Sequence, residues 1–140
     1  MLRTIWCEQA YNVLAITLKE VISMSCRQKP CPQNPRPQTH VHEVQGSVQI
    51  AEIPDDPHNH RFATVSSEVR FNPDGTHFHI VKFRTDFYEN HYHEFCGPTC
   101  NDICVGDNRH IHFLKDETEC SDGHRHEFRF ATFINDPIGD

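Results

Sequence analysis

The spacing of hydrophobic and polar residues divides the chain into three regions. At residues 2–24, apolar side chains recur every three or four positions, which is typical of an amphipathic helix with one buried stripe. Residues 27–38 contain four prolines and no apolar periodicity, as in a stiff linker. From His40 onward the pattern alternates with a period of two and is interrupted by proline and glycine, as expected of short strands. We therefore predict a helix at 1–26, a linker at 27–38 and a β-domain at 39–140.

The β-domain contains a repeated unit of about 33 residues. Equivalent histidines, His58, His91 and His124, follow one another at intervals of 33 residues. The first unit is four residues longer, because His40 and His77 are 37 residues apart. Each unit is predicted to form a strand, a loop and a second strand. The predicted fold class is therefore all-β, with three β-hairpin repeats in a pseudo-threefold arrangement, preceded by the amphipathic helix.

All twelve histidines belong to His-x-His pairs, one pair on each predicted long strand. The pairs are His40/His42, His58/His60, His77/His79, His91/His93, His110/His112 and His124/His126. Residues i and i+2 of a strand share a face, so both rings of a pair point to the same side. On the second strand of each unit that side also holds a phenylalanine, whereas the other side is mostly charged. The phenylalanines are Phe62, Phe95 and Phe128. We therefore expect the histidines to point inward.

Inward imidazoles need bonding partners, because a buried polar group without one costs free energy. Two imidazoles at i and i+2 are about 6.5 Å apart along a strand, close enough to bind one ion at about 2.0–2.1 Å. An acidic residue precedes each second-strand pair by two positions, and it is a candidate third ligand or an acceptor that orients a ring. These residues are Asp56, Glu89 and Asp122. The sequence thus predicts that the twelve histidines and three carboxylates bind a divalent transition metal such as iron, zinc or nickel.

Two arrangements of these ligands are compatible with the sequence. Each hairpin could bind its own ion with two histidine pairs and a carboxylate, and this is slightly favoured because it needs no exact symmetry. Alternatively, three pairs could converge on an axis in each of two layers, giving six-histidine sites that suit iron, nickel or cobalt better than zinc. If the histidines bind no metal, two other interpretations are open: ladders of hydrogen-bonded histidines, or a core that responds to pH.

Charge, hydropathy and cysteine content narrow the class of protein. A net charge of −7 repels phosphate and disfavours nucleic acid as a partner. No apolar run approaches the ~18 residues of a membrane span. The seven cysteines are odd in number and include no Cys-x-x-Cys, which favours reduced thiols in a cytoplasm over a disulfide framework. We therefore expect a cytoplasmic protein whose N-terminal helix covers one end of the β-domain or mediates self-association.

The final stretch of the chain carries a family resemblance. His110-Ile-His112 and Asp122-Gly-His124-Arg-His126-Glu-Phe128, continuing to Ile138, resemble the YmaF family of bacterial proteins. The pattern of His-x-His and Asp-x-His-x-His covers residues 39–138, with Glu89 in place of the usual aspartate. The resemblance implies the repeat boundaries and a bacterial origin, and it implies no activity.

The functional prediction is a metal-binding β-repeat protein that serves in storage, in sensing or as a metal-stabilised structural module. A core poor in apolar residues needs additional stabilisation, and metal binding supplies folding free energy. The alternative is a non-haem metalloenzyme, because Asp56, His58 and His60 have the residue types of a site with two histidines and one carboxylate. Active sites are usually single, so three copies of the same ligands favour the non-enzymatic role.

Overall fold

The computed structural model describes residues 40–134. In this range the chain forms ten short strands in five antiparallel pairs and no helix, which confirms the all-β prediction for this part. The predicted helix at 1–26 and linker at 27–38 lie outside the described residues. Within 40–134, no helical segment has the length and apolarity needed to span a membrane.

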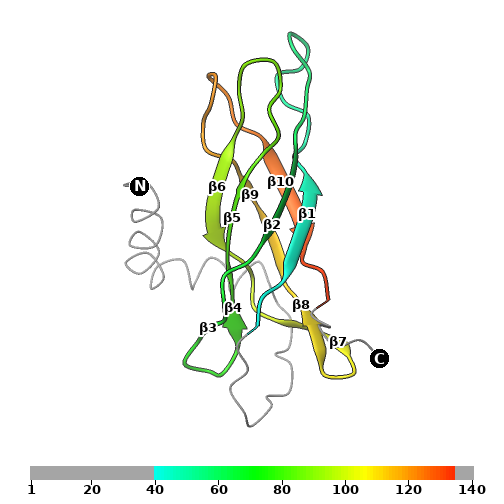
Figure 1. Cartoon of the computed structure of the whole chain (residues 1–140), viewed down its shortest axis with the longest axis vertical. Helices are drawn as coiled ribbons and strands as arrows, with labels where there is room; N and C mark the ends of the chain where they lie inside the picture. The colour runs from blue at the N-terminus through cyan, green and yellow to red at the C-terminus, as the bar shows by residue number, and fades with distance from the viewer. Residues whose placement is uncertain (1–39, 135–140) are drawn as a thin grey trace.

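Three long hairpins form the body of the domain (Figure 1). Each pairs two strands of five residues in antiparallel register: β1 (Glu43–Ser47) with β2 (Arg61–Val65), β5 (Ile80–Arg84) with β6 (Glu94–Pro98), and β9 (Phe113–Glu117) with β10 (Glu127–Ala131). The inward phenylalanines occupy matching positions, because Phe62 lies opposite Gly46, Phe95 opposite Phe83, and Phe128 opposite Asp116. All three hairpins therefore have the same strand register.

Two short hairpins lie together at one end of the domain, away from the loops that join the strands of the long hairpins (Figure 1). They pair β3 (Arg70–Phe71) with β4 (His77–Phe78), and β7 (Ile103–Gly106) with β8 (Arg109–Ile111). These short pairs lead into β5 and β9, so they place histidines at the starts of those strands.

Backbone hydrogen bonds join the three long hairpins into a closed ring. The N–H of Asp86 donates to the carbonyl of Arg61 at 2.9 Å, which joins the second hairpin to the first. The N–H of Glu119 donates to the carbonyl of Glu94 at 2.8 Å, joining the third to the second. The N–H of Gln49 donates to the carbonyl of Glu127 at 2.7 Å, which joins the first hairpin to the third. The hairpins therefore surround a common interior.

The interior contains a small apolar core at the middle of the hairpins. Its buried members are Val44, Val48, Phe62, Val81, Phe83, Phe95, Leu114, Phe128 and Phe130. Phe62 stacks on Phe83 with ring centroids 4.0 Å apart, and Phe128 meets Phe83 edge-on at 5.1 Å. Phe62, Phe95 and Phe128 are all buried, so the prediction that these phenylalanines point inward is confirmed.

The cysteines differ from the prediction. Cys96, on β6, and Cys100 are both disulfide-bonded. The prediction of reduced thiols is therefore wrong at these two positions. An odd number of cysteines does not prevent some of them from pairing, and pairing depends on which residues the fold brings together, which spacing along the chain does not reveal.

Candidate metal centres

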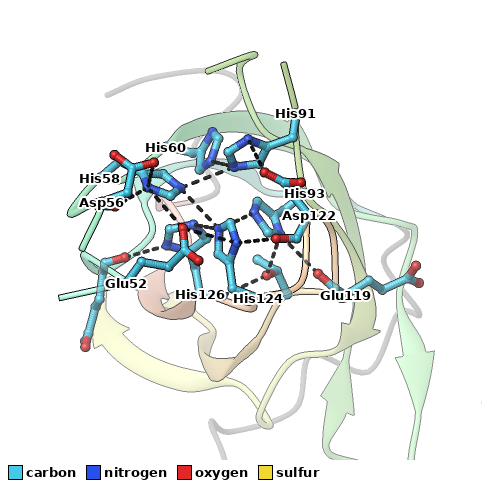
Figure 2. Close-up of polar contacts among 12 residues, drawn as sticks. Glu52, Asp56, His58, His60, His91, His93, Glu119, Asp122, His124 and His126 are labelled. Atoms are coloured by element: carbon cyan, nitrogen blue, oxygen red, sulfur yellow. Dashed lines mark hydrogen bonds and ion pairs between the residues drawn. The ribbon is translucent and has the colours of Figure 1, made fainter. Parts of the chain in front are cut away.

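The twelve histidines form two groups at opposite ends of the long hairpins. Centre 1 consists of His40, His42, His77, His79, His110 and His112, and centre 2 consists of His58, His60, His91, His93, His124 and His126. Each hairpin contributes the pair before its first strand to centre 1 and the pair before its second strand to centre 2. Figure 2 shows the six rings of centre 2 turned toward one another.

The two pairs of one hairpin do not meet. In the hairpin of β5 and β6, the carbonyl of His79 accepts from the N–H of Thr99, and the carbonyl of His93 accepts from the N–H of Thr85. These pairing positions flank the five-residue strands and are six residues apart along each strand, roughly 20 Å at strand spacing. One ion cannot bridge that distance, so the hairpin-local arrangement favoured by the sequence is wrong.

The rings are enclosed by the protein, as expected from the alternation. The second histidine of each pair is 0–1% exposed: His42, His60, His79, His93, His112 and His126. Among the first members of the pairs, His58, His77 and His91 are buried and His40, His110 and His124 are half-buried. The prediction that the imidazoles point inward is confirmed.

The Nδ1 atoms of the most buried rings face away from each centre and bond to the neighbouring hairpin. In centre 1, Nδ1 of His42 donates to the carbonyl of Phe133, Nδ1 of His79 to that of Ser67, and Nδ1 of His112 to that of Cys100, at 2.7–2.9 Å. In centre 2, His60, His93 and His126 donate in the same way to Asp86, Glu119 and Gln49 at 2.8–3.1 Å. A carbonyl can only accept, so the proton of each neutral ring is on Nδ1 and Nε2 carries a lone pair.

The Nε2 atoms converge at the middle of each centre. In centre 1, Nε2 of His110 lies 2.8 Å from that of His40 and 3.1 Å from those of His42 and His77. In centre 2, the Nε2 pairs are 3.1–3.3 Å apart. Within residues 40–134, no group hydrogen-bonds to the buried Nε2 atoms of His79 and His112. In centre 2, both His58 and His124 donate from Nδ1 to a main-chain carbonyl, so both of their Nε2 atoms carry a lone pair at a separation of 3.1 Å. Lone pairs this close repel, unless a cation lies between them.

The six rings of each centre are placed like the corners of an octahedron. Each ring of centre 1 has four neighbouring rings at centroid separations of 4.6–5.5 Å and one ring opposite. Centre 2 repeats this pattern at 4.6–5.4 Å. The opposite pairs are His40/His112, His42/His77 and His79/His110 in centre 1, and His58/His93, His60/His124 and His91/His126 in centre 2.

The shortest Nε2 separations fit the edges of an octahedron around one ion. In centre 1 the ligand atoms of five histidines, His40, His77, His79, His110 and His112, lie within 4.8 Å of one another, and centre 2 has two overlapping groups of this kind, His58/His91/His124/His126 and His60/His91/His93/His126. At a metal–nitrogen distance of about 2.1 Å, adjacent ligand atoms are about 3.0 Å apart in an octahedron and about 3.4 Å apart in a tetrahedron. The separations of 2.8–3.3 Å match the octahedral edge. The donor set is imidazole nitrogen alone, which suits first-row transition metals.

Burial keeps these imidazoles neutral and therefore able to bind metal. It lowers the pKa of His42 and His126 from 6.5 to about 4, and that of His79 and His110 to about 3. Nearby histidines lower these pKa values further, because a second positive charge beside the first is unfavourable. The pKa of His112 is also strongly lowered by burial. Metal binding requires neutral imidazole, and these rings are neutral at pH 7.

Two of the three predicted carboxylates, Asp56 and Asp122, lie behind the rings, on the Nδ1 side. The Oδ2 atom of Asp56 is 3.8 Å from Nδ1 of His58, and that of Asp122 is 3.8 Å from Nδ1 of His91. The main-chain carbonyls of Asp56 and Asp122 accept hydrogen bonds from Nδ1 of His58 and His124. The structure therefore brings these two acids to the outer surface of centre 2, where they can orient and polarise rings.

Glu89 is placed differently. It is exposed, and its positive φ of 49° puts it in a tight turn between Tyr88 and His91. No hydrogen bond or ion pair joins its carboxylate to a histidine in the described part of the chain. The alternation of strand faces does not reach Glu89, because the residue two positions before His91 belongs to the turn.

Sequence reasoning missed a set of buried hydroxyl groups that hold the histidine backbones. Oγ of Ser66, or Oγ1 of the threonines, accepts the N–H of the facing histidine at 2.9–3.0 Å: Ser66 with His42, Thr85 with His93, Thr99 with His79, Thr118 with His126, and Thr132 with His112. The signal was available, because Ser66, Thr99 and Thr132 follow the inward phenylalanines by four positions in each unit.

Two further acids near the centres were also missed. Glu52, in the longer loop of the first hairpin, places Oε2 3.6 Å from Nδ1 of His124. Asp102 is buried beside His77 in centre 1. Asp102 does not recur at the 33-residue interval, so the repeat pattern could not reveal it. Glu52 does recur, because it lies ten positions after His42, as Glu89 and Asp122 lie ten positions after His79 and His112.

Comparison with known proteins gives one family. No curated protein and no solved structure matches the chain. The model of the YmaF family, described as spore germination protein GerY/YamF, matches residues 37–134. This range contains all twelve histidines and covers well over half of the chain. The protein therefore belongs to the YmaF family, as its His-x-His pattern predicted.

Proposed function

We propose that this protein is a metal-binding β-domain whose two six-histidine centres each hold one divalent transition-metal ion in octahedral coordination. The observation that carries the proposal is the octahedral placement of six imidazole rings in each centre, with Nε2 atoms that approach one another to 2.8–3.3 Å. The orphaned Nε2 atoms of His79 and His112 support it, because a buried polar atom without a partner is costly. Iron, nickel and cobalt accept six imidazoles more readily than zinc does.

We further propose that three units surround a pseudo-threefold axis. Equal strand registers in the three long hairpins support this arrangement. So do the hydrogen bonds that join each hairpin to the next and the third back to the first. At each end of the axis, one histidine pair from each unit then meets the pairs from the other two units.

Of storage, sensing and structural stabilisation, the geometry favours stabilisation. An ion bound by six protein ligands has no open position for substrate, in contrast to catalytic sites with two histidines and one carboxylate. Each centre joins residues from three hairpins, so an ion in it would stabilise the closed ring. The small apolar core makes such stabilisation important. The metalloenzyme alternative therefore has less support.

The test is the number and coordination of bound ions. Elemental analysis of the full chain after loading with Ni²⁺ or Fe²⁺ is expected to give two ions per chain, and X-ray absorption is expected to give six nitrogen ligands at about 2.1 Å. Removal of both ions by a chelator should lower the melting temperature by about 10 °C or more, because each tightly bound ion contributes several kcal/mol. Three ions per chain, or four-coordinate ions, would contradict the proposal.

The family description supports placing this domain in spore germination. We propose that its ion-stabilised ring acts there as a rigid structural part. Disulfide bonds persist in oxidising compartments, so the disulfide-bonded Cys96 and Cys100 weigh against the predicted cytoplasmic location. Spores that carry a variant unable to fill centre 1, such as His79→Ala with His112→Ala, should germinate more slowly than wild-type spores. Normal germination of these spores would show that metal binding by centre 1 is not needed for germination.

A further inference from the structure

A buried carboxylate distinguishes centre 1 from centre 2. Asp102 is 1% exposed, and its Oδ1 atom accepts a hydrogen bond from the backbone N–H of His77 at 3.1 Å. The same Oδ1 atom lies 3.4 Å from Nδ1 of His77. His77 therefore has a charged acceptor behind its ring, where the most buried rings of this centre have neutral carbonyls.

Centre 2 has an equivalent carboxylate that is exposed to water. Oδ1 of Asp86 lies 3.4 Å from Nδ1 of His60 and accepts the backbone N–H of Arg61 at 2.8 Å. Its side chain is 57% exposed, whereas that of Asp102 is 1% exposed. The two carboxylates thus have nearly the same geometry toward a histidine ring, and they differ mainly in burial.

Burial decides how strongly a carboxylate affects a nearby ion. Six neutral imidazoles leave the charge of a divalent ion uncompensated, and an uncompensated buried charge is costly. A carboxylate in a poorly polarisable interior compensates more of this charge than one screened by water. A carboxylate close to the Nδ1 proton also makes Nε2 of the same imidazole a stronger electron-pair donor to a metal ion. The acids behind the rings of centre 2, Glu52, Asp56, Asp86 and Asp122, have side chains that are 36–57% exposed and are therefore screened by water. Both effects thus favour the ion in centre 1.

We propose that Asp102 is a charge-compensating and positioning residue for centre 1, and that it makes this centre hold a divalent transition-metal ion more tightly than centre 2 does. The inference rests on the proposed metal binding. It assigns different properties to two centres whose histidines are arranged alike.

The test compares Asp102→Asn with Asp86→Asn in the full chain. Asparagine keeps an oxygen that accepts the backbone N–H and removes only the charge. Competition between Ni²⁺-loaded protein and a chelator is expected to give one tighter and one weaker ion in the wild type. Asp102→Asn should weaken the tighter ion by about 10–100-fold, as is usual for such partners of metal-bound histidine. Asp86→Asn should leave the tighter ion unchanged.

A measurement on the wild-type protein shows which centre fills first, even where Asp102→Asn fails to fold. One equivalent of paramagnetic Co²⁺ should first broaden the amide signals of Thr99 and Thr132, whose hydroxyls hold histidines of centre 1. The signals of Thr85 and Thr118, beside centre 2, should broaden with the second equivalent.

Earlier broadening at Thr85 and Thr118 would overturn the role of Asp102, as would equal effects of the two substitutions. In either case two ions still bind and the proposed function stands. A chain that binds no Co²⁺ or Ni²⁺ would instead overturn the proposed function itself.

Discussion

The Nε2 atoms of His77 and His110 lie 3.1 Å apart, although the two residues are separated by 33 positions in the chain. They come from different long hairpins, and each also has a partner ring in its own His-x-His pair. Because every centre is shared among three hairpins, removing one pair damages a whole centre and leaves the other intact.

Replacing His91 and His93 with alanine is therefore expected to halve the metal content. Loss of two of six ligands should empty centre 2, while centre 1 keeps its ion. The measurement is elemental analysis of the loaded full chain. The matched control is Tyr92→Ala, since Tyr92 lies between the two histidines with its ring beside Arg84 on the other face. A loss of only one third of the ions would support sites confined to single hairpins.

Acidification is expected to destabilise the metal-free protein. In the unfolded chain histidines bind protons near pH 6.5, whereas burial lowers the pKa of His42 and His126 to about 4 in the folded protein. Between these values the unfolded state binds more protons, so the free energy of unfolding falls as the pH drops from 6.5 toward 4. Urea unfolding at pH 7.5, 6 and 5 measures this decline, and equal stability at all three pH values would be inconsistent with it.

Thr118→Val should lower the free energy of unfolding by about 1–3 kcal/mol, because valine has nearly the same shape and leaves a buried N–H without its acceptor. Thr118 is fully buried, and its Oγ1 accepts the N–H of His126 at 3.0 Å. Thr64→Val is the control, since the Oγ1 of Thr64 bonds to the carbonyl of Lys82 in an exposed position. Chemical denaturation of both variants should show a clearly larger effect at Thr118.

Gly46→Ala is expected to cost about 1–3 kcal/mol by overpacking the core. A Cβ atom at position 46 would lie 2.8 Å from Cζ of Phe62, and that ring cannot retreat easily because it stacks on Phe83. Thermal unfolding measures the loss. Ser47→Ala, on the exposed face of the same strand, should change the stability by less than about 0.5 kcal/mol. Equal melting temperatures for both variants would show that the Phe62 ring adjusts freely.

The sequence predicted the direction of the side chains better than the way the hairpins assemble. The alternation through His58, His60 and Phe62 depends only on strand geometry, so it identified the inward face correctly. Which histidine pairs meet depends on the ring closure through contacts such as Gln49 with Glu127, which are long-range and leave no local signal. This explains why the slight preference of the sequence for hairpin-local over shared sites is wrong.

The carboxylates show a second limit. The even spacing of Asp122 and Glu89 from a histidine pair predicts that they lie on the same strand face as the rings. Both have positive φ values, 47° and 49°, and lie in turns, where alternation no longer determines direction. Asp102 was missed for the opposite reason. It is a single acid outside the repeat, and only its burial beside His77 gives it importance.

The closed ring of hairpins has a consequence for how copies of the chain behave toward one another. A strand at an open sheet edge offers free N–H and C=O groups that can template the addition of another chain. In this domain the ends of each long hairpin bond to the next hairpin, and the hydrogen bond from Gln49 to Glu127 completes the circuit. The ends of the described long hairpins are therefore paired within the molecule, which leaves fewer free backbone groups for the addition of another chain.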